Sequence, residues 1–196
     1  MSRIIAGIAG GHHLASVPGS GTRPTTDRVK EALFSRLEAM EVLQDARVLD
    51  LYAGSGSLGI ESASRGAQRV ELVESDAKAA AVCQSNAKLV NKLLRHDAVS
   101  VHRAKVETLL QRSAGPWDLV FLDPPYPLSE TELSTVLTLL SPQLAAGAVV
   151  VVERSSRSPE PAWPAELERF SERGYGETKL WFAEPVEGVA PSDGAE

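Results

Sequence analysis

From residue 47 onward, the hydrophobic positions form short continuous runs that alternate with longer stretches of helical spacing. The continuous runs are rich in valine and leucine, as in strands covered on both faces, and lie at residues 47–53, 69–74, 99–104, 118–123 and 148–153. The stretches with helical spacing lie at residues 58–65, 76–91, 106–112 and 130–140. Strands that alternate with helices of this length predict βαβ units with right-handed crossovers, and hence a parallel sheet.

The pattern changes near the end of the chain. Residues 167–173 and 177–183 are spaced as two strands, and the Gly174-Tyr175-Gly176 stretch between them predicts a tight antiparallel hairpin. We therefore predict an α/β fold with a mostly parallel seven-stranded sheet and an antiparallel hairpin at one edge. Residues 184–196 are rich in Gly, Pro and acidic residues, which predicts a disordered tail.

Two further segments precede the first strand of the predicted sheet. Residues 1–22 are rich in glycine, with short apolar pairs, which predicts a hairpin or a mobile arm before a main domain at 23–183. Residues 22–34, T-R-P-T-T-D-R-V-K-E-A-L-F, predict the start of a helix with Thr25 or Thr26 as its N-cap. This helix would cover the core with one apolar face, formed by Val29, Leu33 and Leu37.

Composition limits the class of protein. With 196 residues, 43% of them hydrophobic and 23% charged, the chain has room for the core of one ordinary globular domain. The longest apolar run, residues 145–152, is far shorter than the ~20 residues of a membrane span. The single cysteine, Cys83, excludes an internal disulfide and a cysteine-based zinc site. We expect a cytoplasmic monomer with no membrane partner, no signal peptide and no metal ion.

Charge is unevenly distributed along the chain. The net charge of −6 argues weakly against a surface coated with basic residues for nucleic acid. Residues 1–30 nevertheless carry one acid, Asp27, against four basic residues, which are Arg3, Arg23, Arg28 and Lys30. An RNA-binding arm and a merely solvated arm both fit this distribution.

The first predicted strand ends in a glycine-rich loop. Within D-L-Y-A-G-S-G-S-L-G-I-E (50–61), Gly54, Gly56 and Gly59 match the pattern G-x-G-x-x-G, and Glu74 ends the next strand about 20 residues further on. Glycines let the backbone approach a ligand, and a carboxylate at the end of the second strand can accept hydrogen bonds from two ribose hydroxyls. NAD and S-adenosylmethionine both contain such a ribose. The loop therefore predicts a nucleotide-like cofactor, and a tight turn without a ligand is the structural alternative.

Asp50 stands just before this loop. Its carboxylate could accept a hydrogen bond from the ammonium group of S-adenosylmethionine, which NAD lacks. It could also cap the backbone amides of the loop itself. Asp50 alone does not decide between the two cofactors.

The fourth predicted strand ends in Asp123-Pro124-Pro125-Tyr126, at the carboxyl edge of the sheet where ligands bind in open α/β folds. The prolines fix a stiff turn, and Asp123 with a proline carbonyl can accept both hydrogens of a planar exocyclic amine. These hydrogen bonds favour a pyramidal nitrogen whose lone pair can attack a sulfonium methyl group, while Tyr126 can stack on the base. The motif therefore favours amino-methyl transfer over an ordinary proline turn.

Several segments together resemble the RsmD family of bacterial 16S rRNA guanine-N2 methyltransferases. They are R-I-I-A-G near the start, T-R-P-T-T-D-R-V-K-E-A-L-F, the glycine loop, V-E-L-V-E (70–74), D-P-P-Y (123–126) and Y-G-E-T-K-L (175–180). The resemblance implies a class I S-adenosylmethionine-dependent methyltransferase with a Rossmann-like sheet. It also implies transfer to the N2 amine of a guanine in 16S rRNA, within an assembled or assembling small ribosomal subunit, with the N-terminal hairpin in contact with RNA.

The resemblance also implies the residues of the site. The cofactor would be held at its methionine part by Asp50, Gly54 and Gly56 and at its ribose by Glu74, and the set is completed by Tyr52, Ala53, Ser55 and Ser75. The guanine would be held by Asp123, Pro124 and Tyr126. The candidates for phosphate contacts are Arg3, Arg23 and Arg28, although Arg28 could instead pair with Asp27 or Glu31.

The chain departs from the family pattern at two places. Gly10-Gly11-His12-His13 replaces a basic run, so fixed positive charge is lost from the predicted arm. Lys105 stands where an Asp or Asn near the adenine is frequent, so no side chain is assigned to adenine recognition.

Three other functions stay open at this point. An adenine-N6 methyltransferase would share the chemistry of D-P-P-Y, but residues 22–34 disfavour it. An NAD-dependent oxidoreductase would use the glycine loop, but it would leave D-P-P-Y unexplained. A non-catalytic RNA-binding assembly factor is disfavoured by the presence of Asp123 and Glu74.

Overall fold

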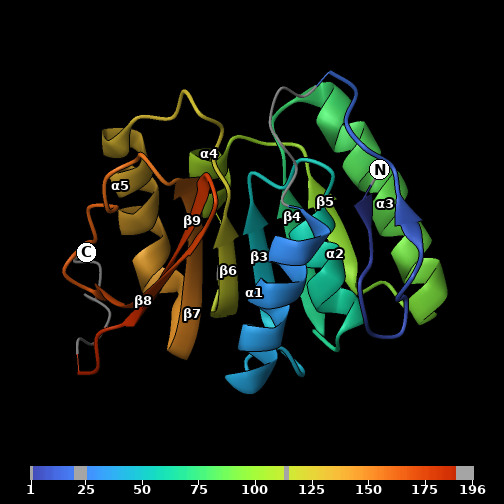
Figure 1. Ribbon diagram of the computed structural model, residues 1–196, viewed down its shortest axis with the longest axis horizontal. Helices are drawn as coiled ribbons and strands as arrows, with labels where there is room; N and C mark the ends of the chain where they lie inside the picture. The colour runs from blue at the N-terminus through green and yellow to red at the C-terminus, as the bar shows by residue number, and fades with distance from the viewer. Residues whose placement is uncertain (1, 20–25, 113–114, 189–196) are drawn as a thin grey trace.

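A seven-stranded sheet forms the centre of the molecule (Figure 1). The computed structural model describes residues 2–19, 26–112 and 115–188. The strands run in the order β5-β4-β3-β6-β7-β9-β8, with β3 to β7 parallel and β9 antiparallel to both β7 and β8. The predicted α/β sheet with an antiparallel terminal hairpin is therefore confirmed. Its strands are β3 (Arg47–Leu51), β4 (Arg69–Val73), β5 (Val99–His102), β6 (Trp117–Leu122), β7 (Leu144–Ser155), β8 (Leu167–Tyr175) and β9 (Thr178–Pro185).

The strand order reverses between β3 and β6. β4 and β5 continue the sheet on one side of β3, while β6 and β7 continue it on the other. In open α/β sheets, ligands bind outside the carboxyl ends of the strands at such a reversal. The loop after β3 contains the glycine pattern and the loop after β6 contains Asp123, so both predicted motifs lie at this edge.

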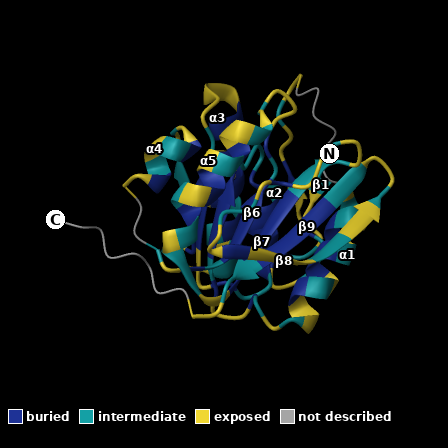
Figure 2. Cartoon of the chain, turned by 90° about the vertical axis from the view of Figure 1, so that its left-hand side faces the viewer, coloured by how far each residue is buried: buried dark blue, intermediate teal, exposed yellow. Residues whose placement is uncertain are grey.

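Helices cover both faces of the sheet, and the sheet separates the core into two layers. On one face lie α1 (Asp27–Ala39), α2 (Ser57–Ser64) and α3 (Ala77–Leu94), and on the other lie α4 (Val106–Leu110), α5 (Glu130–Leu140) and η1 (Ser141–Gln143). Successive residues of a strand belong to opposite layers: Phe121 packs in the first and Val120 in the second. The central strands are therefore buried on both sides (Figure 2), which explains their continuous apolar runs.

The start of α1 follows the predicted capping pattern. Thr26 Oγ1 accepts a hydrogen bond from Val29 N at 3.3 Å, so Thr26 is the N-cap, while Thr25 lies outside the described residues. Leu33 and Leu37 are fully buried, as predicted. Val29 is only half-buried and reaches the rim of a cavity next to Asp123.

The N-terminal segment forms a short antiparallel hairpin of β1 (Ser2–Arg3) and β2 (His13–Leu14). Ile4, Ala9 and Leu14 are buried in the same core layer as α1 to α3. Gly7 has a φ of +82° and approaches α2 so closely that a Cβ atom would lie 1.9 Å from the carbonyl oxygen of Ser64. The hairpin is therefore packed firmly on α2.

Several predicted boundaries are wrong, among them the strand predicted at 148–153, which is β7 and spans Leu144–Ser155. β9 ends at Pro185 and Val186 N donates to Glu166 O at 2.9 Å, so the predicted tail at 184–196 begins too early, although residues 189–196 lie outside the described part. α3 continues past its predicted end at residue 91 to Leu94, where the left-handed φ of Arg95, 63°, stops it. Within the described ranges, no helix is both long and apolar enough to cross a membrane.

Candidate active site

The glycine loop turns sharply between β3 and α2. Gly54 and Gly56 have φ values of +58° and +83°. A Cβ atom on Gly56 would lie 2.8 Å from the Leu72 side chain, because this part of the loop packs on β4. A Cβ atom on Gly54 would meet no atom within 4 Å. Gly56 thus serves packing, while Gly54 leaves a smooth open surface on which a ligand can lie.

Glu74 joins the glycine loop to the loop after β4. Its Oε2 accepts a hydrogen bond from Gly54 N at 2.9 Å, and its Oε1 accepts one from Asp76 N at 2.8 Å. A carboxylate has about four acceptor sites, so each oxygen keeps one for a hydroxyl group. This half-buried carboxylate lies beside the open surface of Gly54, as the ribose prediction requires. Ala53 and Ser55 line the same turn half-buried, and Ser75 is exposed beside Glu74.

Asp50 lies in the core at the end of β3. Its side chain is buried, and Oδ2 accepts a hydrogen bond from Gly59 N at 2.9 Å. The structure shows that Asp50 caps an amide in the first turn of α2, next to the loop, and contact with a ligand stays a prediction. Burial raises the pKa of Asp50 to about 7, with a smaller contribution from the charge of Glu74.

Asp50→Asn should weaken the pH dependence of stability in the ligand-free protein. Between about pH 4 and pH 7 the unfolded chain has ionised Asp50, while the folded protein keeps it protonated. The contribution of Asp50 to the stability of the folded protein is therefore fully present below about pH 4, and it is lost as the pH rises to about 7. Urea unfolding of the wild type and of Asp50→Asn would be measured at pH 4.5 and pH 7.5, at about the two ends of this window. The free energy of unfolding should decline less between these pH values in Asp50→Asn than in the wild type. An equal decline in the two proteins would contradict this role of burial.

A cavity of about 320 Å³ opens beside the second motif. Asp123 follows β6 and Glu153 lies at the matching position of β7, because Leu122 pairs with Val152 in the sheet. Both carboxylates line the cavity, together with the start of α1 and the turn at 175–178 between β8 and β9. Burial raises the pKa of Asp123 well above its usual range, and the nearby charge of Glu153 adds to this effect. The structure thus forms an acidic cavity at the edge where the glycine loop also lies.

Tyr126 and Pro124 line the same cavity. The side chain of Tyr126 is 69% exposed, so its ring is available to a planar partner. Pro124 is buried and fixes the turn between Asp123 and Tyr126. The structure therefore brings the three predicted residues of the D-P-P-Y motif together.

Arg154 holds this loop and was not predicted from sequence. Its nearly buried side chain donates from Nη2 to Leu128 O at 3.3 Å and forms an ion pair with Glu130 at the start of α5. These contacts tie the end of the D-P-P-Y loop to β7. An arginine two residues after a buried run of valines was the available signal.

Tyr52 does not face the open side of the glycine loop. Its side chain packs into the core layer that contains α4 and α5. Burial, and to a lesser extent the charges of Glu107 and Glu132, raises the pKa of Tyr52 above its usual range. Only the backbone of Tyr52, with its φ of 62°, shapes the loop, so a side-chain contact with the cofactor is not supported.

Asn86 of α3 joins the glycine loop to the N-terminal hairpin. Its Nδ2 donates to Ser55 O at 2.9 Å and to Ala15 O at 3.0 Å, and its Oδ1 accepts from Ala15 N at 2.9 Å. The side chain is buried, so these bonds are shielded from water. The hairpin therefore helps to fix the glycine loop, a connection that sequence spacing alone did not predict.

Lys30 and Glu61 form a second connection between the hairpin and α2. Both side chains are completely buried, with Nζ of Lys30 3.7 Å from Oε2 of Glu61. Lys30 donates to Arg3 O at 2.5 Å and to Ser57 Oγ at 3.0 Å, and Glu61 accepts from Ile5 N at 2.8 Å. Lys30 was counted in the positive charge of residues 1–30, but its burial removes that charge from the surface.

The predicted phosphate contacts have little support from the described part of the chain. Arg3 is exposed but forms an ion pair with Asp27 at 3.3 Å. Arg28 is exposed on α1, and Arg23 lies outside the described residues. Their contacts with RNA stay predictions.

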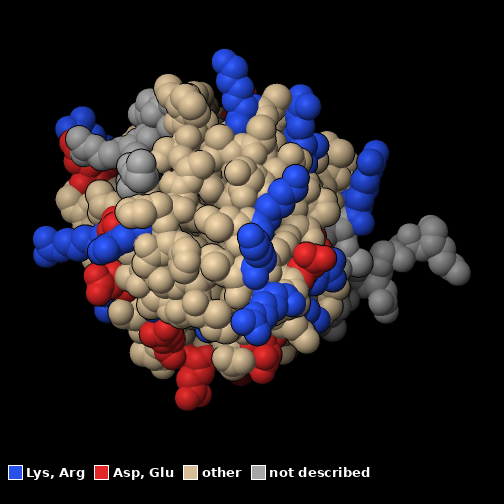
Figure 3. Space-filling view, turned by 90° about the vertical axis from the view of Figure 1, so that its right-hand side faces the viewer, with Lys and Arg blue, Asp and Glu red and all other residues tan. Residues whose placement is uncertain are grey.

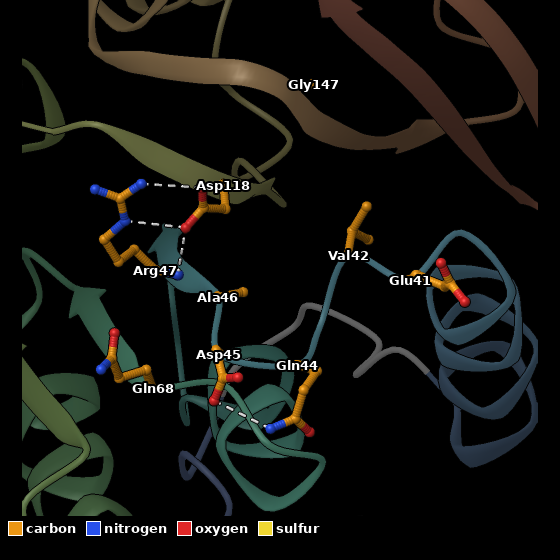
Figure 4. Close-up of a pocket in the computed structure, with 9 residues that line it drawn as sticks. All are labelled: Glu41, Val42, Gln44, Asp45, Ala46, Arg47, Gln68, Asp118 and Gly147. Carbon is orange, nitrogen blue, oxygen red and sulfur yellow. Dashed lines mark hydrogen bonds and ion pairs between the residues drawn. The ribbon is translucent and has the colours of Figure 1, made fainter.

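A larger hollow, of about 560 Å³, lies at the opposite edge of the sheet (Figure 4). It is formed at the amino ends of β3 and β6, away from both motifs. Its principal charged groups satisfy each other, since Arg47 donates to Asp118 from its backbone at 2.8 Å and from Nε at 3.0 Å. This hollow offers no comparable set of ligand-directed groups, so the candidate site is the edge that contains Gly54, Glu74 and Asp123.

The strand order, the glycine loop after β3 and the acid after β4 define the class of protein. This is the fold of the S-adenosylmethionine-dependent methyltransferases. The magnesium protoporphyrin IX methyltransferase of Synechocystis, solved with bound S-adenosylmethionine, shares the fold with a TM-score of 0.64 at 16% identity, over 81% of this chain and 79% of that chain.

The particular family follows from closer similarities. The family described as Conserved hypothetical protein 95 matches residues 2–184. The chain is 36% identical over 175 residues to the ribosomal RNA small subunit methyltransferase D of Escherichia coli (strain K12), which covers 89% of this chain and 85% of that protein. The solved structure of yhhF from Escherichia coli matches with a TM-score of 0.79 at 31% identity, over 93% of this chain and 97% of that chain. The chain belongs to the family of ribosomal RNA small subunit methyltransferase D, and the predicted resemblance is confirmed.

Proposed function

We propose that the protein transfers the methyl group of S-adenosylmethionine to the exocyclic N2 amine of one guanine in 16S rRNA of the small ribosomal subunit. The observation that carries this proposal is the acidic cavity at Asp123, which opens at the same sheet edge as the glycine loop. Membership of an rRNA methyltransferase family supports the reaction and the class of substrate. It also favours methyl transfer over an NAD-dependent oxidoreductase.

The residues of the first loop fit S-adenosylmethionine. Glu74 has acceptor capacity left for the two ribose hydroxyls, and the open surface at Gly54 can take the methionine part. Asp50 is close enough to Glu74 for their charges to interact, and a cationic ammonium nearby would favour its ionised form. When bound, S-adenosylmethionine supplies an electrophilic methyl group on a sulfonium centre.

The residues of the second loop fit the acceptor amine. The carboxylate of Asp123 and the carbonyl oxygen of Pro124 can accept the two amine hydrogens, which directs the nitrogen lone pair away from the ring. Tyr126 can stack on the flipped base. Asp123, with its raised pKa, can take the proton that the nitrogen gives up after methylation. Rate enhancement then comes mainly from positioning and from charge–dipole stabilisation.

Glu153 favours guanine over adenine as the substrate. Guanine presents two neighbouring donors, N1–H and the N2 amine, whereas adenine presents an acceptor at N1 beside its amine. Asp123 and Glu153 line the cavity side by side and can accept from both donors of guanine. An adenine would instead place its N1 lone pair against the second carboxylate. The cavity therefore supports the guanine reaction over the adenine-N6 alternative.

Glu153→Ala should lower kcat/KM for RNA by about 10- to 100-fold, because a charge-assisted hydrogen bond contributes about 1.5–3 kcal/mol. Cofactor affinity should stay unchanged. Since the charge of Glu153 helps to raise the pKa of Asp123, its removal should also move the acid limb of the pH–kcat profile to lower pH. Glu153→Gln keeps an acceptor oxygen and should recover part of kcat/KM while showing the same shift of the acid limb. An unchanged kcat/KM and acid limb in Glu153→Ala would contradict this assignment.

Methyl transfer to ribosomal particles tests the proposed function. Small subunits from cells that lack this enzyme should accept label from S-adenosylmethionine, whereas large subunits and duplex DNA should not. Methyl transfer to 16S rRNA without ribosomal proteins, assayed in parallel, shows whether the reaction requires the assembled particle. Absence of label in every RNA, with S-adenosylmethionine bound, would contradict catalysis and would support the non-catalytic assembly factor.

A further inference from the structure

The charged side chains on the solvent face of α3 are all basic. Its exposed charged side chains are Lys78, Lys88 and Lys92, and Arg95 follows at the C-cap; we call these four residues the basic α3 face. The opposite face is buried, with Cys83 and Val90 in the core layer. No acidic residue occurs within Ala77–Leu94. The helical period therefore gathers the positive charge of this segment on one side.

No described side chain neutralises this face. None of its four residues forms a side-chain hydrogen bond or ion pair within the described part of the chain, although acids outnumber bases in the whole sequence by 26 to 20. Other basic residues are paired, such as Arg47 with Asp118 and Arg154 with Glu130. α3 lies at the right in Figure 1, and the side that faces the viewer in Figure 3 shows Lys and Arg side chains gathered on it.

An ordinary solvated helix face would look different. Such faces commonly alternate acids and bases at i, i+4, where each opposite pair adds about 0.2–0.5 kcal/mol to helix stability. On α3 the i, i+4 pair is Lys88 and Lys92, and Arg95 follows at i, i+3 of Lys92. Like charges at these spacings destabilise a helix by similar amounts. An anionic partner would remove this repulsion.

The start of α3, with Lys78, adjoins the proposed active site. Lys88, Lys92 and Arg95 follow along the helix toward the amino edge of the sheet, where Asn91 bonds Val99 at the start of β5. α3 begins directly after Glu74 and Asp76, at the carboxyl edge of the sheet that also holds Asp123. Its buried Asn86 contacts the glycine loop. Arg103 and Lys105, both exposed, follow the neighbouring strand β5 and extend the positive surface at that edge. A chain of phosphates that enters the cavity can therefore continue along α3.

We propose that the basic α3 face binds the phosphate backbone of the rRNA on the flank of the methylated nucleotide. This inference rests on the proposed function for the identity of the RNA. The face supplies positive charge to the RNA, whereas in residues 1–30 Lys30 is buried and Arg3 is paired with Asp27. Lysines on a helix contact phosphates without reading sequence, so they would fix the register of the RNA while Asp123 and Glu153 select the base.

The variant Lys88→Ala/Lys92→Ala/Arg95→Ala tests this surface. Each lost phosphate contact should reduce the magnitude of the slope of log K against log[salt] by about 0.7–0.9. The magnitude of this slope should therefore be about 2 smaller in the triple variant. The triple variant should also bind small subunits about 10- to 100-fold more weakly at physiological salt. KM for small subunits should rise correspondingly, while kcat at saturating subunits and the Kd for S-adenosylmethionine stay as in the wild type. Thermal unfolding confirms that the exposed alanines leave the fold intact.

A matched variant controls for net charge. Arg112→Ala/Arg157→Ala/Arg173→Ala removes the same number of exposed cations from other elements and should keep the wild-type salt slope. A wild-type slope and KM in the α3 variant would overturn the inference. Subunit binding is measured separately from methyl transfer. If the wild type binds subunits but transfers no methyl group, the proposed function is contradicted. If the α3 variant transfers methyl groups as the wild type does, only the role of this surface is contradicted.

Discussion

Asp123→Ala should reduce kcat for methyl transfer by about 100- to 1,000-fold or more while leaving the affinity for S-adenosylmethionine within about two-fold of wild type. The reason is the position of Asp123 in the acidic cavity, on the far side of the β3–β6 reversal from Glu74. Its loss removes an acceptor for the amine and the group that takes the proton, but no contact of the glycine loop. Single-turnover transfer and calorimetric titration measure the two effects separately.

Asp123→Asn gives a graded version of the same test. Its amide oxygen can still accept one amine hydrogen, so it should retain more activity than alanine. It cannot titrate, so the acid limb that Asp123 imposes on the pH–kcat profile should disappear. Asp118→Asn at the opposite edge of the sheet is the matched control and should keep full transfer activity. Full activity in Asp123→Ala would refute the assignment of this residue.

Glu61→Ala should lower the free energy of unfolding by about 3–5 kcal/mol, the range observed when one partner of a buried ion pair is removed. The change leaves Lys30 buried without its counter-charge, and it deprives Arg65 of a partner at 2.8 Å. It also leaves the amides of Ile5 and Ala6 without their acceptor. Urea unfolding at neutral pH measures the loss. Hydrogen exchange should show the hairpin amides opening first.

Two further variants serve as controls for this prediction. Glu38→Ala removes the other partner of Arg65, but the side chain of Glu38 is 52% exposed, so the loss should be about 1 kcal/mol or less. Lys30→Met in the Glu61→Ala background removes the uncompensated cation and should restore part of the stability. A loss in Glu61→Ala no larger than in Glu38→Ala would show that the network does not hold the hairpin.

The sheet was predictable because its strands are covered on both faces. Runs such as Leu119–Leu122 and Val149–Val152 lie in the core on both sides, so the apolar pattern is continuous and easy to detect. The antiparallel hairpin followed from Gly176, which adopts a φ of +61° between β8 and β9. The place of D-P-P-Y at the carboxyl edge of the sheet was also predicted, because its four residues directly follow a recognisable strand.

The contacts between distant segments could not be predicted in the same way. Arg154 meets Leu128 only because β7 lies beside β6, and Asn86 meets Ser55 and Ala15 only after α3 packs on the hairpin. Lys30 looked like a surface charge, since nothing local reveals that Glu61 is its partner. The basic α3 face, in contrast, was accessible from helical spacing alone and was missed because charge was counted along the chain.

The identity of the methylated nucleoside tests the central claim most directly. Small subunits labelled from S-adenosylmethionine by the wild-type enzyme would be digested to nucleosides and separated against standards, with Asp123→Ala as the control. The acidic pair of Asp123 and Glu153 predicts label in N2-methylguanosine alone, dependent on Asp123. Label in N6-methyladenosine, or label in N2-methylguanosine that persists in Asp123→Ala, would contradict the account.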